Sequence, residues 1–124
     1  MAHEYWTDFK RNPFMWIIDK PRIGANTWIG PFTVLDGSGN PTIGKNCSIS
    51  AGVHVYTHEM ITRNKILRKP VVIGDRVYVG ANAVIMIGSR ISDDAVVGAG
   101  AIVLKNTIIK RGETWVGCPA RRKK

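Results

Sequence analysis

The sequence is poor in cysteine and has no long apolar run. Its two cysteines, Cys47 and Cys118, lie far apart and form no CxxC pattern, which argues against a disulfide framework and a zinc site. No apolar stretch approaches the length of a membrane span, and charges stand where a signal peptide would need its apolar segment. We therefore expect a single-domain, soluble, cytoplasmic protein without a membrane span.

Acidic residues are also scarce. Nine acidic residues stand against 18 basic ones, so the 124-residue chain has a formal net charge of +9. This excess favours a polyanionic partner such as a nucleotide, coenzyme A, nucleic acid or an acidic glycan. Nucleic acid is the weaker alternative, because only Trp115 offers a stacking aromatic near the basic residues 121–124. We therefore predict no nucleic-acid partner.

The sequence does contain a repeat with a period of six. From Ile73 to Thr114 it divides into IGDRVY, VGANAV, IMIGSR, ISDDAV, VGAGAI, VLKNTI and IKRGET. The first position is always a branched aliphatic: Ile73, Val79, Ile85, Ile91, Val97, Val103 and Ile109. The fifth is small or β-branched in six of the seven: Val77, Ala83, Ser89, Ala95, Ala101 and Thr107. A hexapeptide period is typical of a parallel β-helix.

The steric demands of such a coil explain both positions. Each hexad supplies a short strand and a corner, so three hexads make a triangular coil. First-position side chains should point inward and stack between coils, and fifth-position side chains should point into narrow corners. Glycine at the second position (Gly74, Gly80, Gly98) is expected to let the backbone turn without a Cβ penalty. A β-meander, with its period of two, would not hold this frame.

The frame extends back to Ile23 with two interruptions. Residues 35–42 contain two residues more than a hexad and are rich in turn formers, so they should bulge outward at a corner. Residues 61–72 are polar and basic, and form either a loop or two sides of a distorted coil. We predict an all-β fold with an N-terminal cap at 1–22, a β-helix of roughly five coils at 23–114 with a loop at 61–72, and a basic tail at 115–124.

The predicted cap is rich in aromatic residues: Trp6, Phe9, Phe14 and Trp16. A β-helix exposes unpaired backbone groups at its first coil, and such an edge must be covered. We interpret the segment as that cover, in which residues 16–18 can form a first strand. An aromatic platform for a sugar or a base is the alternative.

Sixth-position side chains should point outward. Across successive coils they form the pairs Tyr78/Val96, Val84/Ile102 and Arg90/Ile108, so two of the three faces carry an apolar pair. Exposed apolar stripes usually mark an interface, and a closed cyclic assembly with parallel coil axes would bury them. We predict a homotrimer.

His58 and Glu59 stand at the entrance of the second interruption and are the candidate catalytic residues. A histidine titrates near neutral pH and can act as a general base, and Glu59 could orient it. His54 occupies a sixth position and could pack at an interface instead. A metal site would need three convergent histidines, and only these two are suitably placed, so we predict none. Cys47, in a fifth position, is interpreted as a small inward residue.

Taken together, these motifs resemble the hexapeptide-repeat acyltransferases, in particular those that acetylate sugars. The resemblance covers roughly residues 23–122 and is carried by VYTHE (55–59), VVIGDRVYVGANAVI (71–85), VVGAGAIVLKN (96–106) and VGCPAR (116–121). It implies a left-handed parallel β-helix, a trimer with active sites between subunits, and acetyl-CoA as co-substrate. It also implies that a histidine at the position of His58 activates the acceptor for direct attack on the thioester.

The resemblance further implies cofactor-binding positions. Ala81 and Ala99 match places where pantetheine meets the backbone, whereas Lys105 and Arg121, and more loosely Lys124, match places that meet the nucleotide phosphates. The predicted function is acetyl-CoA-dependent transfer of an acetyl group to a hydroxyl or amino group of a sugar or nucleotide-linked sugar. The alternatives are a non-catalytic β-solenoid that serves as a binding or scaffold protein, and metal-dependent hydration.

Overall fold

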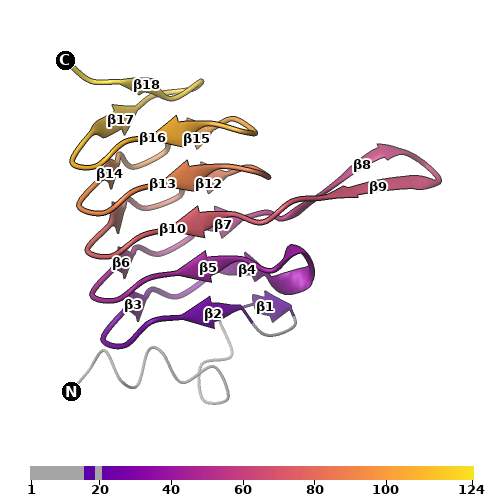
Figure 1. Cartoon of the computed structure of the whole chain (residues 1–124), viewed down its shortest axis with the longest axis horizontal. Coiled ribbons are helices and arrows are strands. Elements are labelled where there is room, and N and C mark those ends of the chain that lie inside the picture. The colour runs from indigo at the N-terminus through magenta and orange to yellow at the C-terminus, as the bar shows by residue number, and fades with distance from the viewer. Residues whose placement is uncertain (1–15, 19–20) are drawn as a thin grey trace.

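The structure, a computed structural model, describes residues 16–18 and 21–124 (Figure 1). The chain winds as an all-β solenoid of five coils. In Figure 1 it crosses the front from right to left and returns behind while it rises, so the coil is left-handed. The predicted left-handed β-helix is therefore confirmed. Within these residues no helix is long and apolar enough to cross a membrane.

Three parallel sheets form the three sides of the prism. Sheet A consists of β1 (Trp16–Ile18), β4 (Val34–Asp36), β7 (His54–Val55), β12 (Val84–Ile85) and β15 (Ile102–Val103). Sheet B consists of β2 (Arg22–Ile23), β5 (Thr42–Ile43), β10 (Val72–Ile73), β13 (Arg90–Ile91) and β16 (Ile108–Ile109). Sheet C consists of β3 (Trp28–Ile29), β6 (Ser48–Ile49), β11 (Tyr78–Val79), β14 (Val96–Val97), β17 (Thr114–Val116) and the antiparallel β18 (Arg121–Arg122).

Strand β1 pairs in parallel with β4, so the first strand expected at residues 16–18 is present. Arg22, at the end of the predicted cap, already belongs to β2, and cap residues 1–15 and 19–20 lie outside the described residues, as do Trp6, Phe9 and Phe14. The proposed aromatic cover therefore stays a prediction.

The strand register follows the hexapeptide frame. Tyr78 pairs with Val96, and Val84 pairs with Ile102, as the repeat predicted. Across the second interruption Thr42 pairs with Val72, so the extra residues between them leave the coil without shifting its register. Each coil therefore places its strands directly above those of the coil before.

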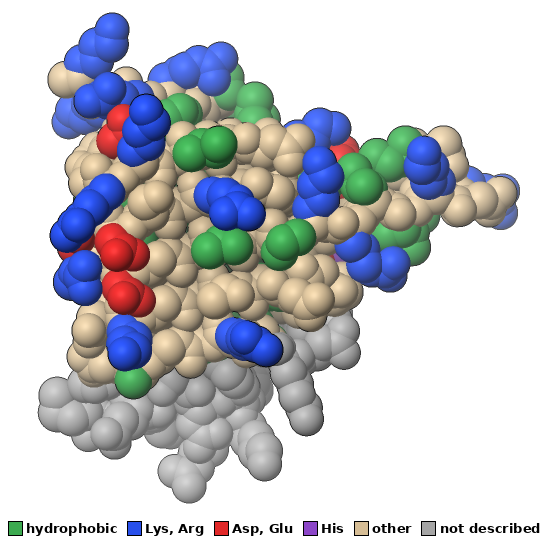
Figure 2. Space-filling view, in the orientation of Figure 1, with side chains coloured by type: hydrophobic (Ala, Val, Ile, Leu, Met, Phe, Trp, Pro, Cys, Tyr) green, Lys and Arg blue, Asp and Glu red, His purple; other side chains and the backbone are tan. Residues whose placement is uncertain are grey.

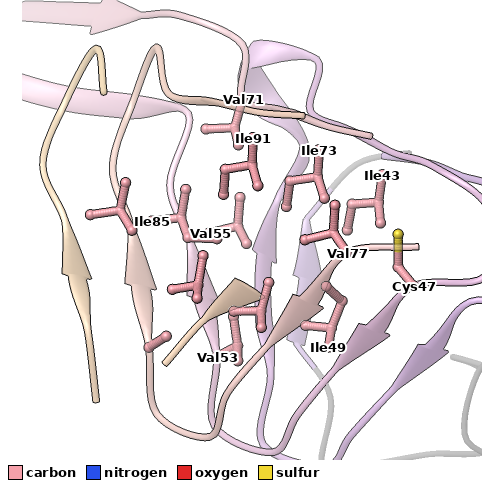
Figure 3. Close-up of a cluster of buried hydrophobic side chains, with 14 of the residues drawn as sticks. Ile43, Cys47, Ile49, Val53, Val55, Val71, Ile73, Val77, Ile85 and Ile91 are labelled. Atoms are coloured by element: carbon pink, nitrogen blue, oxygen red, sulfur yellow. The ribbon is translucent and has the colours of Figure 1, made fainter. Parts of the chain in front are cut away.

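The repeat positions fill the interior of the prism. The first-position aliphatic residues of all seven hexads are buried, and Figure 3 shows several of them stacked between coils, with Ile43, Ile73 and Ile91 in one row. The fifth-position residues are buried too, except Thr107 and Glu113, which are half-buried. Cys47 is buried as predicted, its Sγ donates to the carbonyl of Gly74 at 3.0 Å, and burial raises the pKa of its thiol.

The corners turn at a different position from the one predicted. In the seven hexads from Ile73 to Thr114, the residues with positive φ occupy the fourth position, and four of them are not glycine: Arg76, Asn82, Asp94 and Asn106, with φ between 55° and 62°. The second-position glycines are needed for another reason. A Cβ at Gly80 would overlap the backbone of Ala99 in the next coil. Glycine there permits close stacking of the coils, and the expectation that it allows the turn was wrong.

The first interruption lies at the corner between sheets A and B. Residues Gly37–Gly39 form the 3₁₀ turn η1, whose N-cap is Asp36. The turn projects at the corner, as predicted, but both glycines are buried beneath the coil above. A Cβ at Gly39 would overlap Thr57, so the turn is packed tightly under that residue.

The second interruption leaves the same corner as a β-hairpin. Strands β8 (His58–Thr62) and β9 (Lys65–Arg68) pair antiparallel, and the hairpin extends well beyond the prism in Figure 1. Ile61 is 44% exposed and Leu67 is half-buried, so neither fills a first position of the core. The segment is therefore not two sides of a distorted coil.

Removal of residues 59–70 should leave the β-helix intact, because His58 followed by Val71 and Val72 restores one uninterrupted hexad. We expect a single cooperative unfolding transition in urea, with a free energy of unfolding within about 1 kcal/mol of the full-length protein. A control deletion of residues 59–69 leaves one residue too many for the frame and should be less stable. A non-cooperative transition in the first deletion would contradict this account.

Candidate active site at the corner between sheets A and B

Both interruptions meet at one corner, and their contact creates a polar cluster there. Asp36 ends β4 and is the N-cap of the turn, and His58 begins the hairpin in the coil above. The Nδ1 atom of His58 is hydrogen-bonded to Oδ2 of Asp36. The carboxylate is almost fully buried, at 2% exposure, whereas the imidazole is 38% exposed. The pair therefore joins a buried charge to a ring that solvent can reach.

Backbone groups of both interruptions hold the Asp36 carboxylate in place. Ser38 N donates to Oδ1 at 3.0 Å, and Thr57 N donates to Oδ2 at 3.0 Å. The Thr57 hydroxyl donates to the Asp36 carbonyl at 2.7 Å and accepts from Gly39 N at 2.8 Å. These bonds fix the turn, the carboxylate and the start of the hairpin relative to one another.

The environment of Asp36 keeps its carboxylate ionised. Burial alone would raise the pKa, but hydrogen bonds from Ser38, His58 and Thr57 outweigh burial and hold the pKa of Asp36 well below its usual range. An ionised carboxylate at Nδ1 requires a hydrogen on that nitrogen, so the neutral ring has its lone pair on Nε2. Among the described residues, none hydrogen-bonds Nε2. The ring is thus arranged to accept a proton from a molecule at the surface.

Among the described residues, no hydrogen bond or ion pair joins Glu59 to the imidazole of His58. Its Oε2 lies 3.4 Å from Nζ of Lys105, which belongs to the corner of the fifth coil. The carboxylate that orients His58 is that of Asp36, whereas the sequence suggested Glu59 for this role. The structure does bring His58, Glu59 and Lys105 to the same corner.

The other predicted cofactor positions lie elsewhere on the prism. Ala81 and Ala99 occupy successive coils at the corner between sheets C and A, where Gly100 N donates to the carbonyl of Ala81 at 2.8 Å. Arg121 lies on β18 in sheet C, and Lys124 lines a cavity beside Arg111 at the B–C corner. Within one chain these residues do not line a single cleft with His58.

His54 lies on the outer side of sheet A, and its Nδ1 is 2.8 Å from the hydroxyl of Tyr56. In the part of the chain that the structure describes, no three His, Cys, Asp or Glu side chains gather in a way that could hold a metal ion. His3 lies outside that part.

Asp36 was missed because LDGSGNPT is indistinguishable in sequence from an ordinary turn. The only signal is the register: the two extra residues place Val34 and Leu35 opposite His54 and Val55. Asp36 therefore lies below the start of the second interruption. That inference needs the coil alignment across both interruptions, which the period alone does not supply.

Comparison with known proteins is consistent with this architecture. Residues 70–105 match the family model described as the hexapeptide repeat of succinyl-transferase. The galactoside O-acetyltransferase of Escherichia coli (strain K12) is 35% identical over 95 residues, which cover 77% of this chain and 45% of that protein. The mitochondrial gamma carbonic anhydrase 2 of Arabidopsis thaliana is 34% identical over 117 residues, which cover 79% of this chain and 40% of that protein.

A solved structure is similar over a larger share of its length. The hexapeptide-repeat-containing acetyltransferase of Vibrio cholerae O1 biovar eltor, complexed with acetyl coenzyme A, superposes with a TM-score of 0.80 at 31% identity, covering 90% of this chain and 64% of that one. This chain spans less than half the length of the two curated relatives above. The chain carries the hexapeptide repeat and resembles the hexapeptide-repeat acyltransferases, as its motifs indicated.

The substitution Asp36→Asn should reveal how the buried carboxylate contributes to stability. Because the pKa of Asp36 in the folded protein is below its usual range, the ionised group stabilises the fold above about pH 4, and this contribution is lost as the pH falls further. We expect the variant to lose about 1–3 kcal/mol of unfolding free energy at pH 7. The difference from the wild type should shrink from about pH 4 towards pH 2.

Urea denaturation of both proteins across this pH range measures the effect. Glu59→Gln at the same corner is the control, because its partly exposed pair with Lys105 should contribute little at any pH. If the difference in unfolding free energy between the wild type and Asp36→Asn stays constant across this pH range, the charge of the carboxylate does not contribute to stability.

Proposed function

We propose that the protein is an acetyl-CoA-dependent acetyltransferase in which His58 is the general base. The observation that carries the proposal is the buried, ionised Asp36 at Nδ1 of a half-exposed imidazole. Such a carboxylate fixes the tautomer that can accept a proton at Nε2 and stabilises the imidazolium that results. The resemblance to acetyltransferases, one of them solved with acetyl coenzyme A, supports the choice of reaction.

The proposed reaction is a direct transfer. His58 Nε2 takes the proton of the acceptor hydroxyl or amine as the acceptor oxygen or nitrogen attacks the thioester carbonyl carbon. The negative charge then resides on the carbonyl oxygen, where backbone N–H groups would stabilise it. Collapse of this intermediate breaks the carbon–sulfur bond, and the coenzyme A sulfur leaves with the proton from the imidazolium. Asp36 keeps its charge throughout and acts as a positioning residue.

Acetyl-CoA supplies the activated acetyl group, and we propose that five residues contact it. Small side chains at Ala81 and Ala99 let pantetheine approach the backbone, and the neighbouring Gly100 has open space where a Cβ would be. Lys105 and Arg121, with Lys124 as a looser candidate, would meet the phosphates as cations. Of these three, Lys105 lies at the same corner as His58, where its Nζ is 3.4 Å from Oε2 of Glu59.

These residues lie at separate corners, so we propose that a second copy of the chain completes each site. A cofactor that lies between two copies could touch the His58 corner of one and the Ala81 corner of the other. Sheet A lies between these two corners and carries the outward pair Val84 and Ile102, which is half-buried in the single chain. A homotrimer with parallel coil axes would bring three such pairs of corners together.

For the acceptor we propose a sugar or a nucleotide-linked sugar. The galactoside O-acetyltransferase relative supports a sugar hydroxyl, and the net charge of +9 suits an acceptor that carries phosphate. Incubation with acetyl-CoA and a panel of sugars and nucleotide-sugars, with release of free thiol as the measured signal, tests the acceptor class.

Two alternatives make different predictions. A non-catalytic binding or scaffold protein would show no thermal shift with coenzyme A, whereas a ligand at 100 times its Kd should add about 2.7 kcal/mol of stability. Metal-dependent hydration, which the carbonic anhydrase relative keeps open, would appear as bound zinc in elemental analysis and as carbon dioxide hydration.

Replacement of His58 by alanine should lower turnover by about 10² to 10⁴, because the general base is lost. The thermal shift caused by coenzyme A should remain, since the imidazole is not proposed to bind the cofactor. Met60→Ala, at an exposed position two residues along the hairpin, is the control and should keep its turnover. Turnover near the wild-type value in His58→Ala would place the base elsewhere.

The assembly can be tested with matched surface variants. Val84→Lys puts a charge on sheet A, and Ile108→Lys puts the same charge on sheet B, where Arg90 is the neighbour. Because burial of a lysine in an apolar interface is costly, we expect Val84→Lys to be monomeric and Ile108→Lys to remain a trimer at micromolar concentration. Sedimentation equilibrium measures both masses. A monomeric wild-type protein would contradict the proposal.

A further inference from the structure

The C-terminal end of the β-helix contains a cavity in which Lys124 is the one lining residue that the proposed reaction uses. It has a volume of about 450 Å³ and lies where the last B–C corner meets the tail. Its lining residues are Arg111, Gly112, Glu113, Thr114, Arg122, Lys123 and Lys124. In Figure 1 this end of the chain lies at the upper left, on the side opposite to the hairpin that begins at His58.

Most of the excess positive charge of the protein gathers around this cavity. Residues 110–124 include six of the 18 basic residues and one of the nine acidic residues, which amounts to +5 of the net +9. Figure 2 shows several lysine and arginine side chains at the upper left of the molecule, and others spread over the rest of this face. A concave site surrounded by charges of one sign concentrates the opposite ion.

The one acidic residue of the cavity organises the site. Glu113 Oε1 accepts from Lys110 N at 2.8 Å and from Trp115 Nε1 at 3.2 Å, and Oε2 lies 3.1 Å from Arg122 Nε. The Glu113 side chain is only 12% exposed, so its charge faces these partners rather than the open side. The bond from Lys110 is the main reason that the pKa of Glu113 lies below its usual range. Glu113 thus orients Arg122.

Arg111 and Arg122 each pair with a carboxylate through Nε, which leaves their terminal guanidinium nitrogens available to a ligand. Nε of Arg111 lies 3.4 Å from Oδ2 of Asp94, and Nε of Arg122 lies 3.1 Å from Oε2 of Glu113. Across residues 21–124, no hydrogen bond reaches the terminal nitrogens of either guanidinium group. Terminal guanidinium nitrogens match pairs of phosphate oxygens, and the nearby Lys123 adds a point charge. Gly112, which follows Arg111 in the chain, has open space where a Cβ would be.

We propose that this cavity is a second anion-binding site, which takes a ligand with two or more phosphate groups. Its binding residues Arg111, Arg122 and Lys123 are separate from those proposed for acetyl-CoA. Two forked cations and a lysine around one concave surface suit a diphosphate better than a single carboxylate. Free diphosphates and the paired phosphates of cardiolipin share this chemistry, and the experiment below distinguishes them.

Calorimetric titration of the full-length protein with inorganic pyrophosphate at low salt provides the test, because screening weakens such contacts. In the double variant Arg111→Gln, Lys123→Gln we expect the Kd to rise about tenfold or more. The control Arg22→Gln, Lys45→Gln removes the same charge from the first two coils and should change the Kd by less than about threefold. Lys124 is left unchanged, because we also propose it for the cofactor phosphates.

Co-sedimentation with vesicles that contain cardiolipin separates the two sources of phosphate. Loss of vesicle binding in the first double variant but not in the control would identify lipid headgroups as the source. Loss of pyrophosphate binding alone would identify a free diphosphate. Equal losses in both double variants would show a diffuse charge effect and overturn the site.

The KM for acetyl-CoA distinguishes this site from the cofactor site. We expect it to be unchanged in the first double variant, and a rise parallel to the loss of pyrophosphate binding would mean that the cavity belongs to the cofactor site.

Glu113→Gln provides a further test. The glutamine amide would place an N–H₂ donor opposite Arg122, which is itself a donor, so it could no longer hold the guanidinium group in place. We expect weaker pyrophosphate binding in spite of the added positive charge, and tighter binding would overturn the assigned geometry.

Discussion

Hydrogen bonding between successive coils is the constraint on which the rest of the structure depends. Most strands have only two or three residues and are stable only because each pairs with the coil below and the coil above. Gly80 N, for example, donates to the carbonyl of Val97 at 2.7 Å, and Val84 N donates to that of Ala101 at 2.9 Å. An insertion must therefore return the chain to the same register. Corners are the places where extra residues can leave without breaking these ladders.

That constraint also accounts for the position of the candidate active site. Both insertions leave from the A–B corner, in adjacent coils, so the turn after Asp36 lies directly beneath the hairpin that begins at His58. Irregular backbone from two coils supplies the donors that an ionised, buried carboxylate needs, while the regular sheets keep those donors fixed. A rigid prism thus presents a half-exposed imidazole in a defined orientation.

Charge is distributed unevenly around this prism. At the B–C corner, acidic and basic residues of successive coils pair, as Arg76 does with Asp94 at 2.8 Å. At the C–A corner, the stretch 98–101 has no charged residue, which suits close approach of a neutral chain such as pantetheine. The largest excess of positive charge lies in residues 110–124, where six basic residues stand against one acidic residue. The net charge of the sequence therefore does not indicate where a charged ligand would bind until the stacking of the coils assigns each residue to a corner.

The period of six by itself determined the β-helix, the inward aliphatic stack and the buried Cys47, because these follow from which side of a short strand each residue faces. The tertiary structure decided that residues 58–68 form a hairpin, that second-position glycines serve stacking rather than turning, and that Asp36 is the partner of His58. Each of these depends on contacts between coils, across insertions whose conformation no local pattern encodes. A repeat reports the direction of each side chain, whereas a site requires knowledge of what lies in the next coil.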